Sequence, residues 1–432
     1  MNLSDAEPVA GGEVSGLLRP VMARIDLDAV FHNAQLLARI ARPSLLCAVV
    51  KANGYGHGSV EVARAALAGG ARSLGVAMVE EGVELRRAGI RAPVLLLSEP
   101  QLATMEDVVR YSLTPTVYSE EAVVELERAA RQRGSGTRED LGRIRLHVKV
   151  DTGMHRVGAV PTEAIEIAGR VWASRELCLE GFWTHLSAAD LPDEGAHEVT
   201  RSQLRAFDEA VATLEMRDQR PQMLHAANSA ALIGYPESRY DMVRCGIALY
   251  GYLPSTSLAE PLRAVSGQEQ LVPAMSLEAK VSHVRKVPAG ERVSYGLSYR
   301  APSDRVIATL PLGYADGVPR SFQAAGGEVL IGGERHPLAG VVTMDQLMVD
   351  CGPRSMVRRG DEAVLLGRQG SCEITADEWA GLLGTISYEV LSRIGGRVPR
   401  VATGGPYSSE ALDASEGAVE LGCADEEAQR TT

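Results

Sequence analysis

The sequence predicts an α/β protein in which an N-terminal (β/α)8 barrel of the TIM type is followed by a mostly β C-terminal domain. Two observations support this fold class. Between residues 45 and 244, short apolar segments alternate with longer segments of helical periodicity. Beyond about residue 262, alternating strands, glycine turns and prolines dominate. An open doubly wound sheet is the structural alternative, but the G-x-G-x-x-G turn typical of that fold is absent after the first apolar segment.

The expected elements follow in chain order. Met22–Leu27 is a short strand, and Asp28 is expected to cap the helix after it. The eight predicted barrel strands are Leu45–Val50, Ser73–Val79, Pro93–Ser98, Thr114–Tyr118, Ile144–Asp151, Leu177–Leu186, Met223–Ala227 and Asp241–Arg244. The helical segments between them include Val60–Ala68, Glu80–Ala88, Glu120–Arg131, Thr162–Ala173 and Gln203–Leu214.

The same patterns divide the chain into four parts. Residues 1–21 are expected to form a flexible arm and 22–262 the barrel, although strand 22–27 is expected to pair with the C-terminal domain. Residues 263–404 form the β-rich domain, and 405–432 are expected to be disordered because little in them can be buried. The predicted β-domain elements are the strands Lys280–Val287, Arg305–Leu312, Glu328–Ile331 and Glu362–Leu366, a Gly332-Gly333 hairpin turn and the helix Thr375–Leu383.

Composition limits the classes of function. The net charge of -12 argues against a nucleic acid or an anionic membrane as the main partner. No apolar run approaches the ~20 residues that a membrane span needs, and the first twenty residues lack a secretory signal. The six cysteines are scattered without a C-x-x-C pair. They predict a reducing cytoplasm, no disulfide and no metal site.

One segment carries the strongest chemical signal. The predicted strand Leu45–Val50 ends in Lys51, and Gly54, Gly56 and Gly58 follow within eight residues. Partial burial at a strand end disfavours the ammonium form of a lysine, and a neutral amine can attack a carbonyl to form a Schiff base. A lysine that simply reaches solvent is the plainer interpretation. The nearby Tyr55, His57 and glycines favour a cofactor site.

Polar residues also follow the other barrel strands, where the chemistry of this fold collects. Each of them has a structural interpretation, such as a core histidine, a helix cap or a rim salt bridge. Five such strand ends at one face of a barrel are difficult to explain by packing alone. These residues are Lys51, the segment Asp151–Arg156, His185, the group His225, Asn228 and Ser229, and the group Arg244, Gly246 and Ile247.

Several longer motifs resemble those of the alanine racemases. The segment Ala48–Gly58 is similar to the pyridoxal-phosphate attachment segment of that family, and the likeness extends from about residue 22 to 403. The other matching segments are Lys149–Arg156, His225–Ser229, Val293–Gly296, Gly313–Gly317, Met344–Gln346 and Arg397–Arg400. The family fold is a barrel followed by a β domain.

The resemblance implies a cofactor, pyridoxal 5′-phosphate, and two catalytic bases that act on opposite faces of the substrate Cα. Lys51 would hold the cofactor and act as one base, and Tyr295 from the β domain of a neighbouring subunit would be the other. A phenol with its ordinary pKa of about 10 is a poor base at neutral pH. The resemblance implies that His185 contacts this tyrosine and that Arg244 contacts His185, which supplies the cationic surroundings that the phenol needs. Arg244 would also face the pyridine nitrogen, which an arginine cannot protonate in practice.

The remaining site residues are also implied by the resemblance. Arg156 and the backbone N–H of Met344 would bind the substrate carboxylate, and Lys149 matches a position that is carbamylated in some members. Thr343 and His155 differ from the residues that are common at these positions in the family. They leave open which amino-acid side chain the substrate carries. The residues expected at the cofactor and its phosphate, besides Lys51, are Tyr55, His185, Asn228, Ser229, Arg244, Gly246, Ile247 and Tyr388.

The leading interpretation is a cytoplasmic, homodimeric isomerase with shared active sites that interconverts L- and D-alanine and supplies D-alanine for peptidoglycan. The alternatives are a racemase for serine or another amino acid, a barrel-type decarboxylase, and a non-catalytic carrier of the cofactor. Arg244 and the Tyr295 motif argue against the decarboxylase, and the β domain argues against the carrier.

Overall fold

The computed structural model describes residues 17–134, 142–405 and 407. The expected N-terminal arm lies outside the described residues up to residue 16, and so does the expected tail apart from residues 405 and 407. The chain divides into two compact units. Among the described residues, the barrel unit contains Phe31–Ala52, Val62–Leu271 and Tyr407, and the β unit contains residues 17–30, Asn53–Glu61 and residues 272–405.

The barrel unit is built on parallel strands in two four-stranded sheets, in the orders β4-β3-β2-β9 and β5-β6-β7-β8. Backbone hydrogen bonds join the sheets at both edges. The Leu96 N–H donates to Thr114 O at 2.9 Å, and the Arg244 N–H donates to Ala227 O at 3.0 Å. The eight strands therefore close into the predicted barrel. They are β2 (Leu45–Val49), β3 (Ser73–Val76), β4 (Val94–Leu96), β5 (Thr116–Val117), β6 (Ile144–Lys149), β7 (Leu177–Trp183), β8 (Met223–His225) and β9 (Met242–Cys245).

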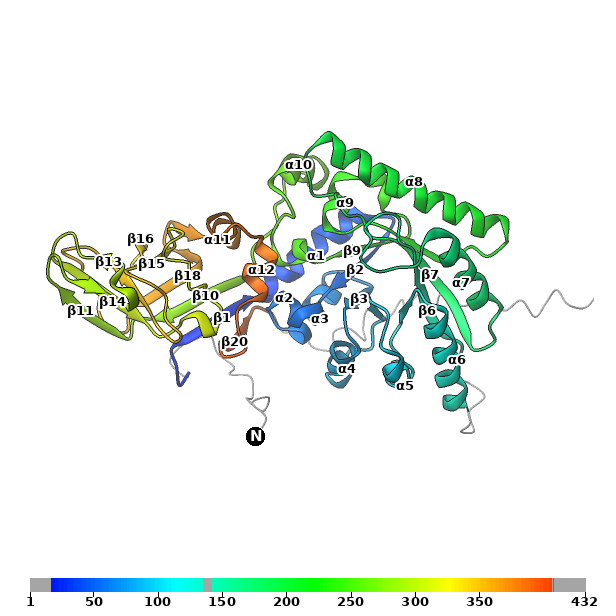
Figure 1. Cartoon of the computed structure of the whole chain (residues 1–432), viewed down its shortest axis with the longest axis horizontal. Coiled ribbons are helices and arrows are strands. Elements are labelled where there is room, and N and C mark those ends of the chain that lie inside the picture. Colours follow the sequence, from blue (N-terminus) through cyan, green and yellow to red (C-terminus); the bar gives the residue numbers. More distant parts are fainter. Residues whose placement is uncertain (1–16, 135–141, 406, 408–432) are drawn as a thin grey trace, which may run out of the picture. The chain divides into compact units, whose positions relative to one another are not determined.

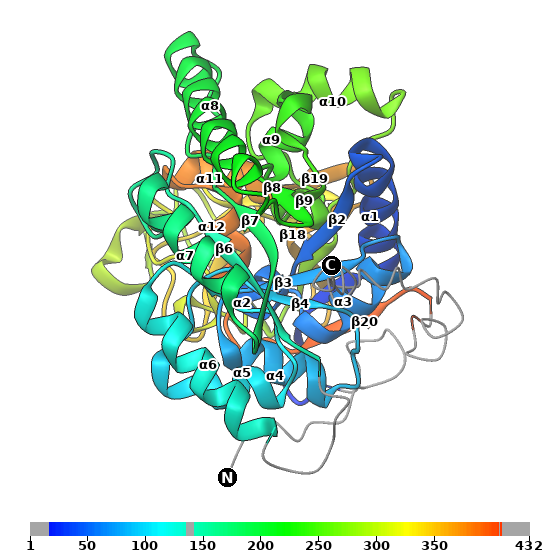
Figure 2. The same ribbon diagram turned by 90° about the vertical axis from the view of Figure 1, so that its right-hand side faces the viewer.

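Helices cover the outside of this barrel. Figure 1 shows α6 and α7 on the outer side of β6 and β7, and Figure 2 shows the barrel strands surrounded by helices. Within the described residues, no helix is long and apolar enough to span a membrane. The helices that lie wholly or partly in this unit are α1 (Leu27–Ala41), α2 (Lys51–Tyr55), α3 (Ser59–Ala68), α4 (Val79–Arg87), α5 (Met105–Arg110), α6 (Glu120–Gly134), α7 (Pro161–Ala173), α8 (Glu194–Met216), α9 (Ser229–Gly234) and α10 (Ala259–Ser266).

The β unit is centred on a sheet in the order β16-β15-β18-β10-β1-β20, with β19 paired to β18. Its first strand comes from the start of the chain: β1 pairs antiparallel with β10 and parallel with β20. The strands of this sheet are β1 (Val21–Asp26), β10 (Met275–Lys280), β15 (Glu328–Ile331), β16 (Glu334–Pro337), β18 (Glu362–Gln369), β19 (Cys372–Ile374) and β20 (Arg400–Thr403).

Two smaller sheets and two helices complete the β unit. The three-stranded sheet has the order β11-β14-β17, and β12 pairs with β13. Gly332 and Gly333 join β15 to β16 at φ values of 64° and 80°, which is the tight hairpin expected. The remaining elements are β11 (His283–Val287), β12 (Arg292–Val293), β13 (Tyr299–Arg300), β14 (Arg305–Leu310), β17 (Leu347–Asp350), α11 (Ala376–Leu383) and α12 (Ser387–Ser392).

Three local expectations were wrong. The stretch expected as one strand, Lys280–Val287, breaks at residues 281–282, so that β10 and β11 join different sheets. The cap of α1 is Asp26, whose carboxylate accepts the Ala29 N–H at 3.0 Å, and not Asp28. Cys178 is disulfide-bonded, against the expectation of no disulfide, whereas Cys47, Cys245, Cys351 and Cys372 are free.

Candidate active site

Lys51 stands directly after β2, at the start of an unusual turn. The next four residues, 52–55, all have positive φ values, between 52° and 59°. A left-handed turn of this kind costs roughly 1–2 kcal/mol for each residue with a Cβ, and such strain collects at functional sites. The Asn53 side chain helps to hold the turn by accepting the Ser59 N–H at 3.1 Å.

The surroundings of Lys51 favour its neutral form. Partial burial and the positive charge of Arg156 lower the pKa of Lys51, and the Glu81 carboxylate opposes them. Glu81 itself accepts the N–H of Ala52 at 2.6 Å. A larger fraction of this amine than of a solvated lysine is therefore neutral at physiological pH and available as a nucleophile or base.

The loop after β6 holds Arg156. One carboxylate oxygen of Asp151 accepts the backbone N–H groups of Gly153, Met154 and His155 at 2.9, 2.9 and 3.1 Å. His155 has a φ of 54°, a left-handed conformation that glycine would adopt at less cost. Arg156 is exposed and makes no hydrogen bond or ion pair within the part of the chain that the structure describes.

Lys149 lies at the end of β6 and is only 3% exposed. Burial, together with Arg244 and Arg156, lowers its pKa to about 7, against the opposing effect of Asp151. Its Nζ lies 4.6 Å from the centre of the Trp183 ring. This amine is thus held in the barrel with a large share of neutral form at physiological pH.

Arg244 is buried on β9, and its guanidinium donates to neutral acceptors. Its Nη2 donates to Thr184 O and Ala226 O, both at 3.0 Å, and lies 3.3 Å from His185 Nδ1. Burial lowers the pKa of Arg244 to about 10, which leaves it charged at neutral pH. Burial and the charge of Arg244 hold the pKa of His185 well below its usual range, so His185 is neutral.

Four further predicted residues lie around the ends of β8 and β9. Ser229 is buried at the start of α9, and its Oγ accepts the Gly246 N–H at 3.0 Å. Ile247 follows as the buried first residue of a 3-10 helix, Ile247–Tyr250. Asn228 caps α9 by accepting the Ala231 N–H at 3.0 Å, so its side-chain oxygen serves the helix here.

The β unit contains the other predicted residues. The rings of Tyr55 and Tyr388 lie 6.0 Å apart in a tilted arrangement. Tyr295 is 73% exposed and lines a cavity of about 460 Å³ together with Thr343 and Met348. Met344, the residue after Thr343, is 52% exposed. The structure thus groups Tyr55 with Tyr388, and Tyr295 with Thr343.

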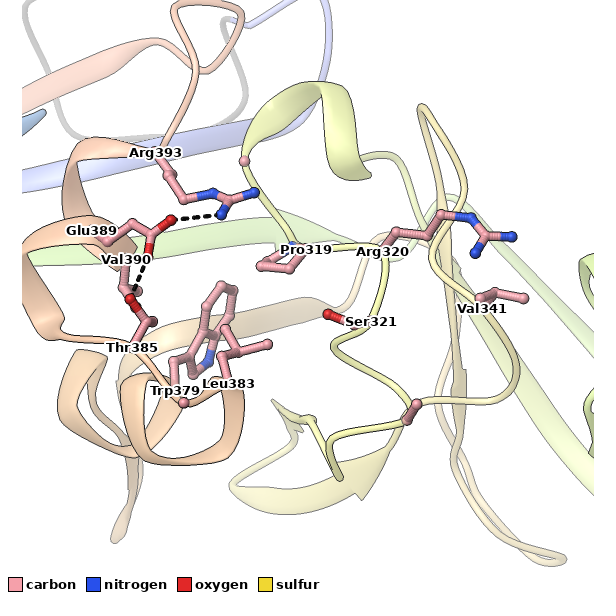
Figure 3. Close-up of a pocket in the computed structure, with 13 residues that line it drawn as sticks. Pro319, Arg320, Ser321, Val341, Trp379, Leu383, Thr385, Glu389, Val390 and Arg393 are labelled. Carbon is pink, nitrogen blue, oxygen red and sulfur yellow. Dashed lines mark hydrogen bonds and ion pairs between the residues drawn. The ribbon is translucent and has the colours of Figure 1, made fainter.

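A second cavity in the β unit, of about 670 Å³, lies apart from these residues (Figure 3). Pro319, Ser321 and Trp379 line it, and Glu389 bonds to both Arg393 and Thr385 at its edge. None of the predicted site residues lines this cavity.

The sequence analysis did not predict a buried polar group that is hydrogen-bonded to Arg244. Its members are His225, His147 and Glu180. His225 had been noticed only as a strand-end residue, and His147 and Glu180 were not identified at all. His147 stands two residues before Lys149 on β6, so both side chains face the same side of the strand. The sequence did contain a signal for this group. His147 lies two residues before Lys149 in one predicted strand, and Gly181 lies inside the next one.

Comparisons with known proteins agree with this arrangement. The family model for the N-terminal domain of alanine racemases matches residues 25–254, and the model for the C-terminal domain matches residues 274–402. The chain belongs to the alanine racemase family. It is accordingly an isomerase, an amino-acid racemase whose reaction is the racemisation of alanine.

Individual relatives cover most of this racemase. The alanine racemase of Symbiobacterium thermophilum is 45% identical over 89% of this chain and 97% of its own length. Alanine racemase 2 of Bacillus subtilis is 41% identical over 89% of this chain and 95% of its own. Among solved structures, the alanine racemase of D-cycloserine-producing Streptomyces lavendulae has a TM-score of 0.80 at 41% identity, covering 89% of this chain and 97% of that one. That of Bacillus anthracis with bound L-Ala-P has a TM-score of 0.80 at 35% identity, covering 90% and 96%.

Proposed function

We propose that the racemase works with pyridoxal 5′-phosphate, held through Lys51, and that Lys51 and Tyr295 are its two bases. The observation that carries the proposal is an excess of positive charge around Lys51. The charges of Arg156 and Arg244 lower the pKa of Lys149, and Arg156 also lowers that of Lys51. Lys149, Arg156 and Arg244 all lower the pKa of His185. The carboxylates that oppose these effects on the two lysines are Asp151 at Lys149 and Glu81 at Lys51. Such a group of cations favours anions, and the cofactor phosphate and the substrate carboxylate are the anions of this reaction.

When bound, the cofactor supplies an electron sink for the charge left at the substrate Cα. The chain must then move protons on the two faces of that carbon. The lowered pKa of Lys51 makes its Nζ able to accept a proton on one face. The phenolic oxygen of Tyr295 is assigned to the other face by the family motif.

Arg244 is proposed to hold the pyridine nitrogen by a hydrogen bond. A guanidinium donates hydrogen bonds but does not give up its proton at neutral pH, and even the lowered pKa of about 10 keeps Arg244 charged. The pyridine nitrogen would then stay unprotonated, and the electron sink that the cofactor supplies would be weaker. This property suits a racemase, because a long-lived carbanion would favour transamination.

The phosphate is proposed to bind among Tyr55, Ser229, Gly246, Ile247 and Tyr388. Two pairs in this set are close together within their own units, Ser229 with Gly246 and Tyr55 with Tyr388. Asn228 supports the group by capping α9.

Arg156 is proposed to bind the substrate carboxylate, with the Met344 N–H assisting. Arg156 suits this role because its guanidinium is exposed and makes no internal ion pair among the described residues. The L-Ala-P in the Bacillus anthracis relative supports an amino acid of alanine size as the substrate.

Lys149 is proposed to be carbamylated. Carbon dioxide reacts with a neutral amine, and the pKa of about 7 provides that form near physiological pH. The carbamate would replace a buried positive charge by a negative one. It would thereby offset the charges of Arg156 and Arg244 and orient Arg156.

The enzyme is also proposed to be a cytoplasmic homodimer in which Tyr295 and Met344 complete the site of the partner subunit. The exposure of Tyr295, Met344, Leu297 and Ile386 on the β unit, between 52% and 73%, supports a covered surface there. D-Alanine for peptidoglycan would be the product used by the cell.

The decisive experiment incubates the purified enzyme, with and without added pyridoxal 5′-phosphate, with L-alanine or L-serine. Chiral chromatography should show D-alanine accumulating until the two enantiomers are equal, with serine reacting more slowly. Release of carbon dioxide would indicate a decarboxylase. Activity that is unchanged after complete removal of the cofactor would overturn the proposal.

A further inference from the structure

A buried line of hydrogen bonds runs from Arg244 into the barrel. Arg244 Nη1 lies 2.7 Å from His225 Nδ1, and His225 Nε2 lies 2.8 Å from His147 Nδ1. His147 Nε2 lies 3.2 Å from a carboxylate oxygen of Glu180. Each of the four side chains is at most 8% exposed, and each comes from a different strand among β6, β7, β8 and β9.

The chemistry of its two ends gives this line one direction. A guanidinium can only donate, so His225 Nδ1 must accept. The proton of a neutral His225 then sits on Nε2 and is donated to His147 Nδ1. His147 in turn carries its proton on Nε2 and donates it to Glu180, which can only accept when ionised. Burial and the charge of Arg244 keep the pKa of His225 well below its usual range, in agreement with a neutral ring.

A glycine makes room for this arrangement. A Cβ placed on Gly181 would lie 2.4 Å from His147 Nδ1, a distance that two such atoms cannot adopt. The pairing of β6 with β7 also shifts its register between Leu146 and His147. A glycine inside a strand typically marks such a close approach. The fold therefore accommodates the His147 ring at the cost of a regular strand pair.

Among the described residues, Arg244 is linked to a carboxylate only through this line of hydrogen bonds. Its other acceptors are the carbonyls of Thr184 and Ala226 and the neutral His185. If His225 moved its proton to Nδ1, two donors would face each other at 2.7 Å and the guanidinium would have to shift. Whatever fixes the His225 tautomer therefore fixes the position of Arg244.

We propose that His147 and Glu180, seated against Gly181, are positioning residues that set the tautomer of His225 and thereby hold Arg244 in place. The inference rests on the proposed role of Arg244 at the pyridine nitrogen. Without Glu180, the His147 ring loses the acceptor that orders both imidazoles, and His225 can adopt the opposite tautomer. Arg244 then no longer has a single position.

The test combines a tautomer measurement with kinetics on the full-length holoenzyme. In protein labelled with ¹⁵N-histidine, the shifts of the two ring nitrogens distinguish the tautomers, and His225→Gln assigns the signals. Wild type should show His225 protonated at Nε2. In Glu180→Leu, a signal for His225 protonated at Nδ1 should appear. The kcat for L-alanine should fall by about tenfold with KM nearly unchanged, and more pyruvate should form by transamination.

Three further variants serve as controls. Glu180→Gln keeps an acceptor and should restore the wild-type tautomer and most of kcat. Gly181→Ala should reproduce the effect of Glu180→Leu without removing a polar group, and it provides the test if Glu180→Leu does not fold. Glu166→Leu, at an exposed carboxylate of α7, should change neither readout.

Two results would overturn the proposal. One is a wild-type His225 protonated at Nδ1. The other is a folded Glu180→Leu or Gly181→Ala enzyme with the wild-type tautomer and kcat. A failure of the proposed cofactor chemistry is distinguishable, because the tautomer of His225 is measured without any turnover.

Discussion

The Nζ of Lys149 lies 4.6 Å from the centre of the Trp183 ring, and Lys149 makes no ion pair within the described residues. An aromatic face attracts a cation but compensates only part of the lost hydration. The pKa of Lys149 is therefore lowered to about 7. Its unfolded value is near 10.4.

This difference in pKa predicts how stability depends on pH. Between pH 7 and 10, the unfolded chain binds the Lys149 proton and the folded enzyme does not, so the free energy of unfolding rises with pH by up to about 1.4 kcal/mol per unit from this group. Below pH 7 Lys149 is protonated in both states, so the full cost of burying its charge lowers the free energy of unfolding. Urea unfolding in CO₂-free buffer should show this slope in wild type but not in Lys149→Met, and bicarbonate should reduce it. Equal slopes in the two proteins would contradict the lowered pKa.

Lys51 should be the only lysine that retains the cofactor. The chain has four lysines, at positions 51, 149, 280 and 286. Borohydride treatment of the yellow enzyme should attach the cofactor to Lys51, as peptide mass spectrometry would identify. Lys51→Ala should lose racemisation, and the exposed Lys286→Ala should keep it. A Lys51→Ala enzyme that racemises at the wild-type rate without an added amine would exclude this assignment.

Tyr295 should be needed in both directions, because each direction uses one base to remove a proton and the other to return one. Tyr295→Phe should lower kcat by about 10²–10⁴, the usual contribution of a general base. It should still bind cofactor and exchange the Cα hydrogen of one enantiomer through Lys51, as NMR in D₂O would detect. Tyr111→Phe, on a half-buried tyrosine of the barrel unit, is the matched control. Equal exchange of both enantiomers in Tyr295→Phe would rule out the division of labour.

Gly313 should be intolerant of any side chain. A Cβ there would lie 2.1 Å from Thr343 O and 2.5 Å from Met344 O. Gly313→Ala should therefore destabilise the enzyme by about 1–3 kcal/mol, and should raise KM for alanine by displacing Met344. Gly381→Ala, in α11 with open space around it, should leave stability equal or increase it by up to about 1 kcal/mol. The comparison is made by urea unfolding, and a neutral Gly313→Ala would show that the two loops separate freely.

The proposed homodimer predicts complementation between two inactive proteins. Lys51→Ala and Tyr295→Phe should regain activity when mixed, dissociated and reassociated, because one site of the mixed dimer then carries both lesions and the other carries none. The activity should fall on dilution below the dimer dissociation constant. Native mass spectrometry would confirm that mixed dimers form. Inactive mixed dimers would mean that each site lies within one chain.

The sequence alone determined the fold class and the main chemical group. Period-two and period-3.6 patterns are local, so the eight barrel strands and most helices could be predicted within a few residues. Lys51 was identifiable because a buried strand ending in a lysine and glycines is a contiguous signal. Motif likeness then supplied Tyr295 and Met344, which no local pattern links to Lys51.

The tertiary structure decided what depends on neighbours distant in sequence. The lowered pKa of Lys149 comes first from its burial and then from the charges of Arg244 and Arg156, which lie nearby only in the folded chain. The break after Lys280 follows from pairing with different strands, which local propensity does not specify. Likewise, His147 and Glu180 meet only because adjacent barrel strands bring their side chains together over Gly181. Burial and hydrogen bonding between strands are collective properties, and only the folded chain defines them.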